Sequence, residues 1–241
     1  MSRTKKFIVL DTETCNTIEQ PLPYDIGWAV CDKKGRIYAE RSYVISEIFL
    51  GMRDVMKSAY YANKIPKYWD DIKAGTRVVA GMWEIRRQLV ADMKQYKTNI
   101  VCAYNMGFDK RALNNLMRYV SKSWKRWFFP FGTEYQCIWS LACQVILSRT
   151  TFIKFAEKNG FVSEANNILT NAEITYRYIT NTLDFQEEHT GLEDVKIEVE
   201  ILKECYRQKK KMDGRINSSC WRMVQKKRKE LDLRATFKEV A

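Results

Sequence analysis

The segment FIVLDTET, residues 7–14, constrains the fold of this chain more than any other stretch. Its apolar run from Phe7 to Leu10 predicts a buried β-strand that leads directly into Asp11 and Glu13. Because side chains alternate along a strand, these two carboxyl groups would point to the same side. Two neighbouring acids raise each other's pKa unless a cation lies between them. The segment therefore predicts a cation site at the end of a strand. The alternative is a loop that begins at Asp11, with Glu13 in solvent.

The other apolar segments follow an α/β order. Further strands are predicted at 25–32, at 36–46, at 99–105 and at the start of 134–147. Helices are predicted at 47–77 with a break at Pro66, and at 76–96, 110–120, the rest of 134–147, 151–158 and 192–211. The turn at residues 33–35 would join two strands as a hairpin. Hairpin-like strands followed by alternating helices and strands predict a mixed sheet covered by helices.

Composition and cysteine content exclude several classes of protein. Hydrophobic residues make up 46% of the 241-residue chain, which is enough for a substantial core. No run of about eighteen apolar residues predicts a transmembrane helix. The basic start, MSRTKK, leads into only four apolar residues, so no signal peptide is predicted. The seven cysteines form no CxxC pair, which indicates reduced thiols of an intracellular, cytoplasmic protein and no zinc site.

Positive charge is concentrated at the C-terminal end. The chain has a net charge of +12, and residues 202–241 hold thirteen Lys or Arg against five Asp or Glu, a net of +8. Such a surface attracts polyanions, most often nucleic acid, by releasing their condensed counterions. The alternative is a pair of solvated basic helices that keeps the protein soluble.

A second basic stretch, SKSWKRWFF at 121–129, alternates cations with aromatic rings. Rings beside cations suit single-stranded nucleic acid, because its bases stack on rings and its phosphates attract cations. The same aromatic residues could equally belong to the core, and the sequence does not separate the two interpretations.

The only histidine, His189, lies in EEHTGLEDV and is followed by Asp194. Thr190 and Glu193 have the spacing of a capping box, so a helix is predicted to begin near Gly191. This places His189 in the preceding loop, mobile and exposed, and Asp194 in the first helical turn. A lone histidine is a weak signal by itself.

Asp109 lies at a predicted strand-to-helix junction in AYNMGFDKRAL. A carboxylate there would reach the same edge of the sheet as Asp11 and Glu13 if the two strands are neighbours. The alternative is an ordinary helix N-cap.

Together these motifs resemble the DEDDh branch of the DnaQ-like 3′–5′ exonuclease superfamily, which includes proofreading-type exonucleases. The D-x-E motif of the family is similar to LDTET, its N-x-x-F-D motif to AYNMGFD, and its H-x-x-x-x-D motif to HTGLED. The resemblance extends over residues 7–205. It implies an RNase H-like α/β fold, with a mixed five-stranded sheet flanked by helices, an insertion before the last motif and a basic helical C-terminal tail.

The resemblance also implies a catalytic set. Asp11, Glu13, Asp109 and Asp194 would be acids that hold two metal ions, and His189 would be the general base. Four carboxylates in one cleft require divalent cations, and hard oxygen ligands favour Mg²⁺ or Mn²⁺ over zinc. Two such ions could stabilise the attacking and leaving oxygens of an in-line phosphoryl displacement.

Further residues would contact the terminal nucleotide by the same resemblance, namely Thr12, Thr14, Asn105 and Phe108. The implied activity removes nucleoside 5′-monophosphates from the 3′ ends of single-stranded DNA. RNA ends are the alternative substrate, and a non-catalytic nucleic-acid-binding or polymerase-docking module is a further one. A DNA polymerase or another replication protein is a possible partner of such an enzyme, and a phage-encoded one would act in the host cytoplasm.

The domain prediction divides the chain into an exonuclease domain at 1–206 and a basic extension at 207–241. Residues 159–188 are longer than compact relatives need before the last motif, so we expect an insertion there, with EITYRYIT as paired strands. The chain departs from the family pattern at Tyr104, where many relatives have histidine, and at Cys15 and Asn16, where Thr-Gly is commoner.

Overall fold

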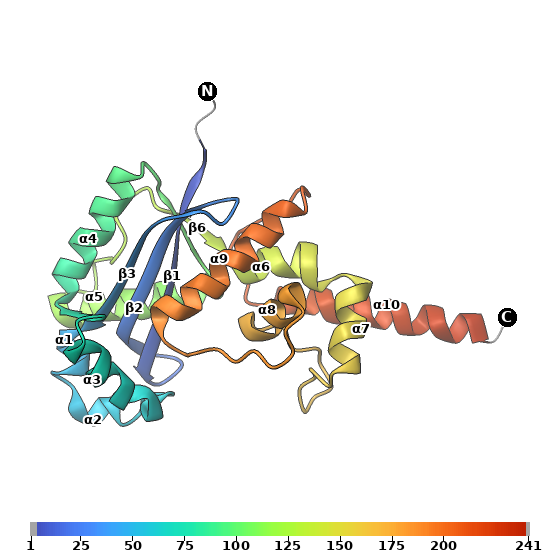
Figure 1. Ribbon diagram of the computed structural model, residues 1–241, viewed down its shortest axis with the longest axis horizontal. Coiled ribbons are helices and arrows are strands. Elements are labelled where there is room, and N and C mark those ends of the chain that lie inside the picture. Colours follow the sequence, from blue (N-terminus) through green and yellow to red (C-terminus); the bar gives the residue numbers. More distant parts are fainter. Residues whose placement is uncertain (1–3, 240–241) are drawn as a thin grey trace.

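A mixed six-stranded sheet forms the centre of the computed structural model, which describes residues 4–239 and the side chains of residues 4–233 (Figure 1). The strands are β1 (Lys6–Asn16), β2 (Pro21–Asp32), β3 (Ile37–Ile45), β4 (Val78–Ala80), β5 (Ile100–Ala103) and β6 (Glu134–Cys137), in the order β4-β3-β2-β1-β5-β6. β2 pairs antiparallel with both β1 and β3, and the other pairs are parallel. The predicted mixed α/β sheet is confirmed.

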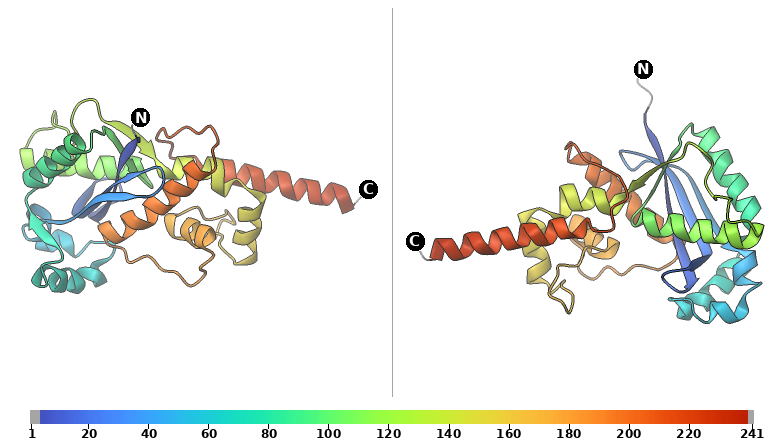
Figure 2. Two further views of the ribbon diagram at one scale, coloured as in Figure 1. Left: turned by 45° about the horizontal axis from the view of Figure 1, so that its top comes forward. Right: turned by 180° about the vertical axis from the view of Figure 1, so that it is seen from behind.

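Helices cover both faces of this sheet. They are α1 (Ser46–Phe49), α2 (Arg53–Met56), the 3-10 turn η1 (Ala62–Lys64), α3 (Ile65–Lys73), α4 (Met82–Gln95), α5 (Met106–Ser121), α6 (Ile138–Ala142), the π-helical η2 (Cys143–Leu147), α7 (Thr150–Lys158), α8 (Ala172–Thr180), α9 (Gly191–Arg207) and α10 (Trp221–Glu239). One core packs between the sheet and the α1–α5 segment, and the other between the sheet and α6–α10. The first turns of α10 pack against α7 and η2, and its C-terminal part extends away from the rest of the molecule (Figure 2).

Strand β1 is buried on both faces, which explains its uninterrupted apolar run. Ile8 and Leu10 belong to the core beneath α4 and α5, whereas Phe7 and Val9 belong to the core beneath α9. The four side chains are 0% exposed. The strand is therefore held from both sides, and the acids at its carboxyl end are carried by a rigid element.

Three predictions of local structure are wrong. The sheet has six strands instead of five because Val78–Ala80 pairs with β3, and the helix predicted from residue 76 begins only at Met82. EITYRYIT forms helix α8 instead of paired strands, because the Asn171 side chain accepts a hydrogen bond from the Ile174 N–H (3.0 Å) and caps a helix there. The break predicted at Pro66 falls just before it, where η1 ends at Lys64 and α3 begins at Ile65, with Pro66 in the first turn, where its missing N–H costs nothing.

None of the described helices is long and apolar enough to cross a membrane. All seven cysteines are buried and have free thiols. Burial raises the pKa of several of these thiols, as at Cys15, to about 11. These cysteines therefore pack as small apolar side chains of the core.

Candidate active site

A cavity of about 230 Å³ lies where the carboxyl end of β1 meets the start of α5 and the start of α9. It is lined by Asp11, Thr12, Glu13, Tyr61, Tyr104, Asn105, Phe108, Asp109, Ala172, Glu187, His189, Asp194 and Glu198. Six of these side chains are acidic, and none is a lysine or an arginine. Segments more than 170 residues apart in the sequence thus bring their polar side chains to one place.

Strand β1 supplies Asp11 and Glu13 to this cavity, as their alternation predicts. Glu13 is 7% exposed and pairs across the sheet with Asp25 of β2. The register shifts between Glu13 and Thr14, and such an irregularity turns the following side chains away from their regular positions. Thr14 lies just after the shift and is not one of the lining residues, unlike the other predicted contact residues.

Asp109 lies within the first turn of α5 and not at its cap, so the interpretation of this residue as a helix N-cap is wrong. Asn105 holds the N-cap position instead. The Asp109 side chain is 3% exposed and accepts a hydrogen bond from the Thr12 hydroxyl (2.9 Å). This bond joins the first and second motifs directly. It also assigns the Thr12 hydroxyl to orienting Asp109.

Helix α9 begins at Gly191 with Thr190 as its N-cap, as predicted. The predicted capping box is not formed in its usual way, because the Thr190 hydroxyl bonds to the Glu193 carboxylate and neither side chain caps a backbone N–H. The Gly191 N–H donates instead to Asp25 (2.9 Å). Asp194 follows in the first turn and is 9% exposed.

His189 precedes this helix with a left-handed backbone, at φ 54°. The prediction of an exposed histidine is wrong, since only 24% of its side chain is exposed. The imidazole stacks on the ring of Tyr61 at a centroid distance of 3.9 Å and an interplanar angle of 9°. Its Nδ1 lies 3.9 Å from the Glu187 carboxylate. The ring therefore has a defined orientation on two sides.

A buried network holds the start of α9 against the sheet. Asp25 is 0% exposed and accepts hydrogen bonds from Arg77 (2.9 Å), from the Tyr68 hydroxyl (2.8 Å) and from the Gly191 N–H. The helix also crosses β2 at a glycine, because a Cβ added to Gly27 would lie 2.3 Å from the backbone nitrogen of Leu192. No larger residue fits this crossing without a shift of the helix.

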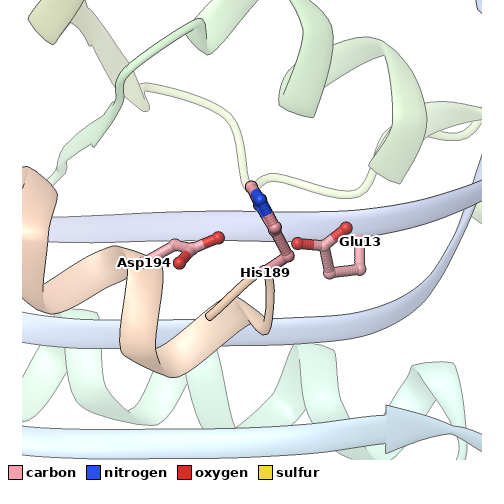
Figure 3. A group of neighbouring side chains, drawn as sticks. All are labelled: Glu13, His189 and Asp194. Carbon is pink, nitrogen blue, oxygen red and sulfur yellow. The ribbon is translucent and has the colours of Figure 1, made fainter. Parts of the chain in front are cut away.

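Glu13, His189 and Asp194 are the most closely grouped members of the site. Ligand atoms of these three lie within 4.8 Å of one another. Figure 3 shows the imidazole between the two carboxylates. Asp11 and Asp109 line the same cavity but fall outside this group of three. Glu173 and Glu187 form a second group of the same spacing with His189.

Burial raises the pKa of every acid of the predicted catalytic set, and repulsion from neighbouring acids adds to it for Asp11, Glu13 and Asp194. The pKa of Asp109 rises to about 7, mainly through burial. Burial is also the first cause for Glu13, whose pKa rises to about 8, and for Asp194, whose pKa rises to about 9; the charges of Asp25 and of Glu187 respectively come next. Burial and the charge of Asp109 raise the pKa of Asp11. Such a site holds its negative charge only when a cation compensates it.

The donor set fits divalent cations. The side-chain oxygens Oδ1 of Asp194 and Oε2 of Glu198 are buried and have no hydrogen-bond partner among the described residues. Unpartnered carboxylate oxygens in a cavity without lysine or arginine are the environment that Mg²⁺ and Mn²⁺ occupy. The residues present therefore fit a divalent cation in chemistry.

Five lining residues were not among the predicted site residues, namely Tyr61, Tyr104, Ala172, Glu187 and Glu198. Three of them, Glu198, Glu187 and Tyr61, are acidic or stack on His189. Glu198 follows Asp194 by four positions on α9, so helical spacing alone places it on the same face. It is 3% exposed, and burial together with the charge of Asp109 raises its pKa. Glu187 lies two residues before His189, so its position in the sequence could also have indicated a place in the site. Tyr61 comes from the distant α1–α3 segment, and no local pattern could have placed it against His189.

Comparison with known proteins gives structural neighbours only. No family model matches the sequence, and no curated protein does. Exonuclease X in complex with 5′-overhanging duplex DNA is 14% identical, with 89% of this chain and 99% of that chain covered and a TM-score of 0.44. Exonuclease I from Methylocaldum szegediense is 13% identical, with 86% and 41% covered and a TM-score of 0.49. Pop2p of S. pombe in a form with Mg²⁺ and Mn²⁺ bound is 14% identical, with 89% and 87% covered and a TM-score of 0.45.

Exonucleases are thus among the structural neighbours, which is the class that the sequence motifs resemble. The chain spans about two-fifths of the exonuclease I chains that it matches. Because the identities are 14% or lower and the TM-scores are below 0.5, only the residues of this chain indicate its function.

Proposed function

We propose that this chain is a metal-dependent 3′–5′ exonuclease of the DnaQ-like superfamily that removes nucleoside 5′-monophosphates from single-stranded DNA. One observation carries the proposal. The four acids of the three motifs, together with the only histidine of the chain, line a single cavity although they come from β1, α5 and the start of α9. An isolated D-x-E would be weak evidence, but the convergence of all five side chains has a specific chemical use.

Asp11, Glu13, Asp109 and Asp194 are the residues that would hold the divalent cations. When bound, such ions stabilise the negative charge that develops on the attacking and leaving oxygens of a phosphodiester. Asp109 is oriented for this purpose by its bond from Thr12. Glu198 adds a fifth buried carboxylate next to Asp194, and its unpartnered oxygen would complete the coordination or accept a hydrogen bond from water.

His189 acts as the general base in this proposal. Burial is the main cause that lowers the pKa of its imidazole, so the ring is neutral at pH 7 and accepts a proton from the attacking water. Nδ1 lies 3.9 Å from the Glu187 carboxylate, so this proposal assigns the proton from water to Nε2. The Glu187 carboxylate then stabilises the imidazolium. The ring of Tyr61 stacks on the imidazole and holds it in its orientation.

The terminal nucleotide would contact Asn105 and Phe108, which line the cavity at the start of α5. Thr12 would act mainly through Asp109, and Thr14 would act indirectly because it lies outside the lining. We assign residues 1–206 to the catalytic domain. The insertion at 159–188 contributes Ala172 and Glu187 to the cavity, so in this proposal it helps to shape the site.

The basic extension at 207–241 would bind the phosphate backbone. In the described part, α10 begins at Trp221, and its cations Arg222, Lys226 and Lys229 are exposed, whereas Arg228 is paired with Glu157. Residues 240 and 241 of the predicted extension lie outside the described residues.

The proposal is tested with single-stranded DNA and RNA of the same sequence, each labelled at its 3′ or its 5′ end, in the presence of Mg²⁺. We expect immediate release of a labelled mononucleotide from the 3′-labelled DNA and a ladder of shortened products from the 5′-labelled DNA. The Asp194→Asn variant, which keeps the side-chain volume, should release nothing. Release from RNA alone would correct the substrate, and no release from either polymer would refute the exonuclease.

A further inference from the structure

A cluster of exposed aromatic rings and cations lies at the far end of α5 from the cavity. We call it the aromatic-basic patch and define it by Arg118, Lys122, Trp124, Lys125, Arg126 and Trp127. Trp124 is 74% exposed and Trp127 is 57% exposed. Large rings are rarely left in solvent in such a group, and a patch of this kind usually marks a binding surface.

The segment that carries the patch is anchored in the core. Phe128 is 0% exposed, its N–H donates to the Asn114 side chain (3.0 Å), and its carbonyl accepts from Arg86 (2.6 Å). The two interpretations of SKSWKRWFF are therefore both true, each for its own half. The end of the segment at Phe128 packs in the core, and this packing fixes the backbone that carries the exposed Trp124.

Each exposed ring of the patch has a cation close to its face or edge. Lys125 lies 5.5 Å from the centroid of Trp124, and Arg118 lies 5.0 Å from the centroid of Trp127. The Nε of Arg118 is buried and has no hydrogen-bond partner among the described residues. Residues 118–133 contain four Lys or Arg and no Asp or Glu. The patch therefore combines stacking surfaces with positive charge, and its own segment contributes no acid.

Helix α5 connects the patch to the cavity. Its first turn carries Phe108 and Asp109 of the site, and its last turn carries Arg118. Sixteen residues of helix span about 24 Å. Exposed Arg111 lies along the way, with its guanidinium 5.5 Å from the Phe108 ring. At a rise of about 3.4 Å per nucleotide, this distance corresponds to roughly seven nucleotides of a stacked strand, and to fewer of an extended one.

We propose that the aromatic-basic patch is a second binding site for single-stranded nucleic acid, which holds the strand on the 5′ side of the nucleotide in the cavity. Bases would stack on Trp124 and Trp127, and phosphates would pair with the four cations. Aromatic residues and arginine also occur at protein interfaces, but four cations without one acid match a polyanion better. The role of the patch in holding a substrate rests on the proposed exonuclease activity, whereas binding itself does not.

The test compares a 20-nucleotide and a 5-nucleotide single strand of thymidine, each with a fluorescent label. Binding is measured by anisotropy in EDTA, so that no turnover occurs. The Trp124→Ala/Trp127→Ala variant should lose about ten-fold or more in affinity for the 20-mer, in line with the usual effect of removing stacking rings. The 5-mer should lose less affinity than the 20-mer, because the cavity can hold it without the patch.

A charge variant and a matched control complete the experiment. Lys122→Ala/Lys125→Ala should lower the slope of log affinity against log salt for the 20-mer by about 1.4, since each phosphate contact contributes roughly 0.7 for single strands. Trp69→Ala, which removes another exposed tryptophan on α3, should leave 20-mer binding unchanged. Equal unfolding temperatures of all variants show that the fold is kept.

The outcomes separate the two proposals. Unchanged 20-mer affinity in both patch variants overturns the second binding site, even if the patch proves to bind a protein. If the patch variants bind the 20-mer more weakly but the unmodified chain releases no mononucleotide, the second site is supported and the exonuclease is refuted.

Discussion

The substitution Gly27→Ala tests whether the crossing of α9 over β2 sets the geometry of the cavity. Gly27 lies outside the cavity and carries no functional group. A Cβ at this position would lie 2.3 Å from Leu192 N, whereas an ordinary contact begins at 3.4 Å. The start of α9 must therefore move by about 1 Å, and Asp194 in its first turn moves with it. A displacement of about 1 Å in a catalytic group costs on the order of 100-fold in rate.

The assay is kcat/KM on 3′-labelled single-stranded DNA, measured together with thermal unfolding. Overpacking should also cost about 1–3 kcal/mol of unfolding free energy, which lowers the unfolding temperature by roughly 2–12 °C in a chain of this size. Activity is therefore compared at a temperature where every variant is folded.

The matched control is Gly81→Ala, where the nearest atom is the Glu47 carboxylate at the end of a flexible side chain, 3.3 Å away. It should retain activity within about two-fold. Wild-type kcat/KM in the Gly27→Ala variant, with an unchanged unfolding temperature, would refute the claim that this crossing positions Asp194.

Three other predictions follow from the same geometry. Arg77→Met leaves the buried Asp25 carboxylate without its cation, so we expect a loss of about 3–5 kcal/mol in the free energy of unfolding by urea; a loss below 1 kcal/mol would show that the pair is not structural. His189→Ala should lower kcat by about 100- to 10,000-fold and leave Mn²⁺ binding measurable by calorimetry, and full activity would remove the general base. The raised pKa values of Glu13 (about 8) and Asp194 (about 9) mean that the folded, metal-free protein holds protons that the unfolded chain releases near pH 4. Its unfolding temperature in EDTA should therefore fall as the pH rises from 6 to 9, and Mg²⁺ should restore it most at the high end; a rise with pH would contradict the assigned burial.

Local patterns sufficed for much of the fold. The apolar run of β1 and the junction before Asp109 were predictable because each depends on neighbours in the sequence. The same holds for the start of α9 at Gly191, although the bonds that form there differ from the predicted capping box. Here the buried Asp25 competes for the backbone N–H of the helix.

The errors arise where tertiary contacts decide. β4 has only three residues, and its strand character comes from pairing with β3, which no local window contains. Helix α8 has a β-branched and aromatic sequence that favours a strand, but its Asn171 cap and its packing against α9 make it a helix.

The candidate site shows the same division between local and long-range information. Glu198 could have been found from helical spacing, since it is one turn beyond Asp194 on α9. The stacking of Tyr61 on His189 joins residues 128 positions apart and depends on how the α1–α3 segment packs over the end of β1. The exposure of Trp124 likewise depends on the burial of Phe128 beside it.

Anomalous diffraction from crystals grown with Mn²⁺ and a nucleoside 5′-monophosphate tests the central claim most directly. The account predicts two peaks about 4 Å apart in the cavity, within coordination distance of Asp11, Glu13, Asp109 and Asp194, with the phosphate between them and His189. A single peak held by Glu173, Glu187 and His189, or no peak in the cavity, would contradict it.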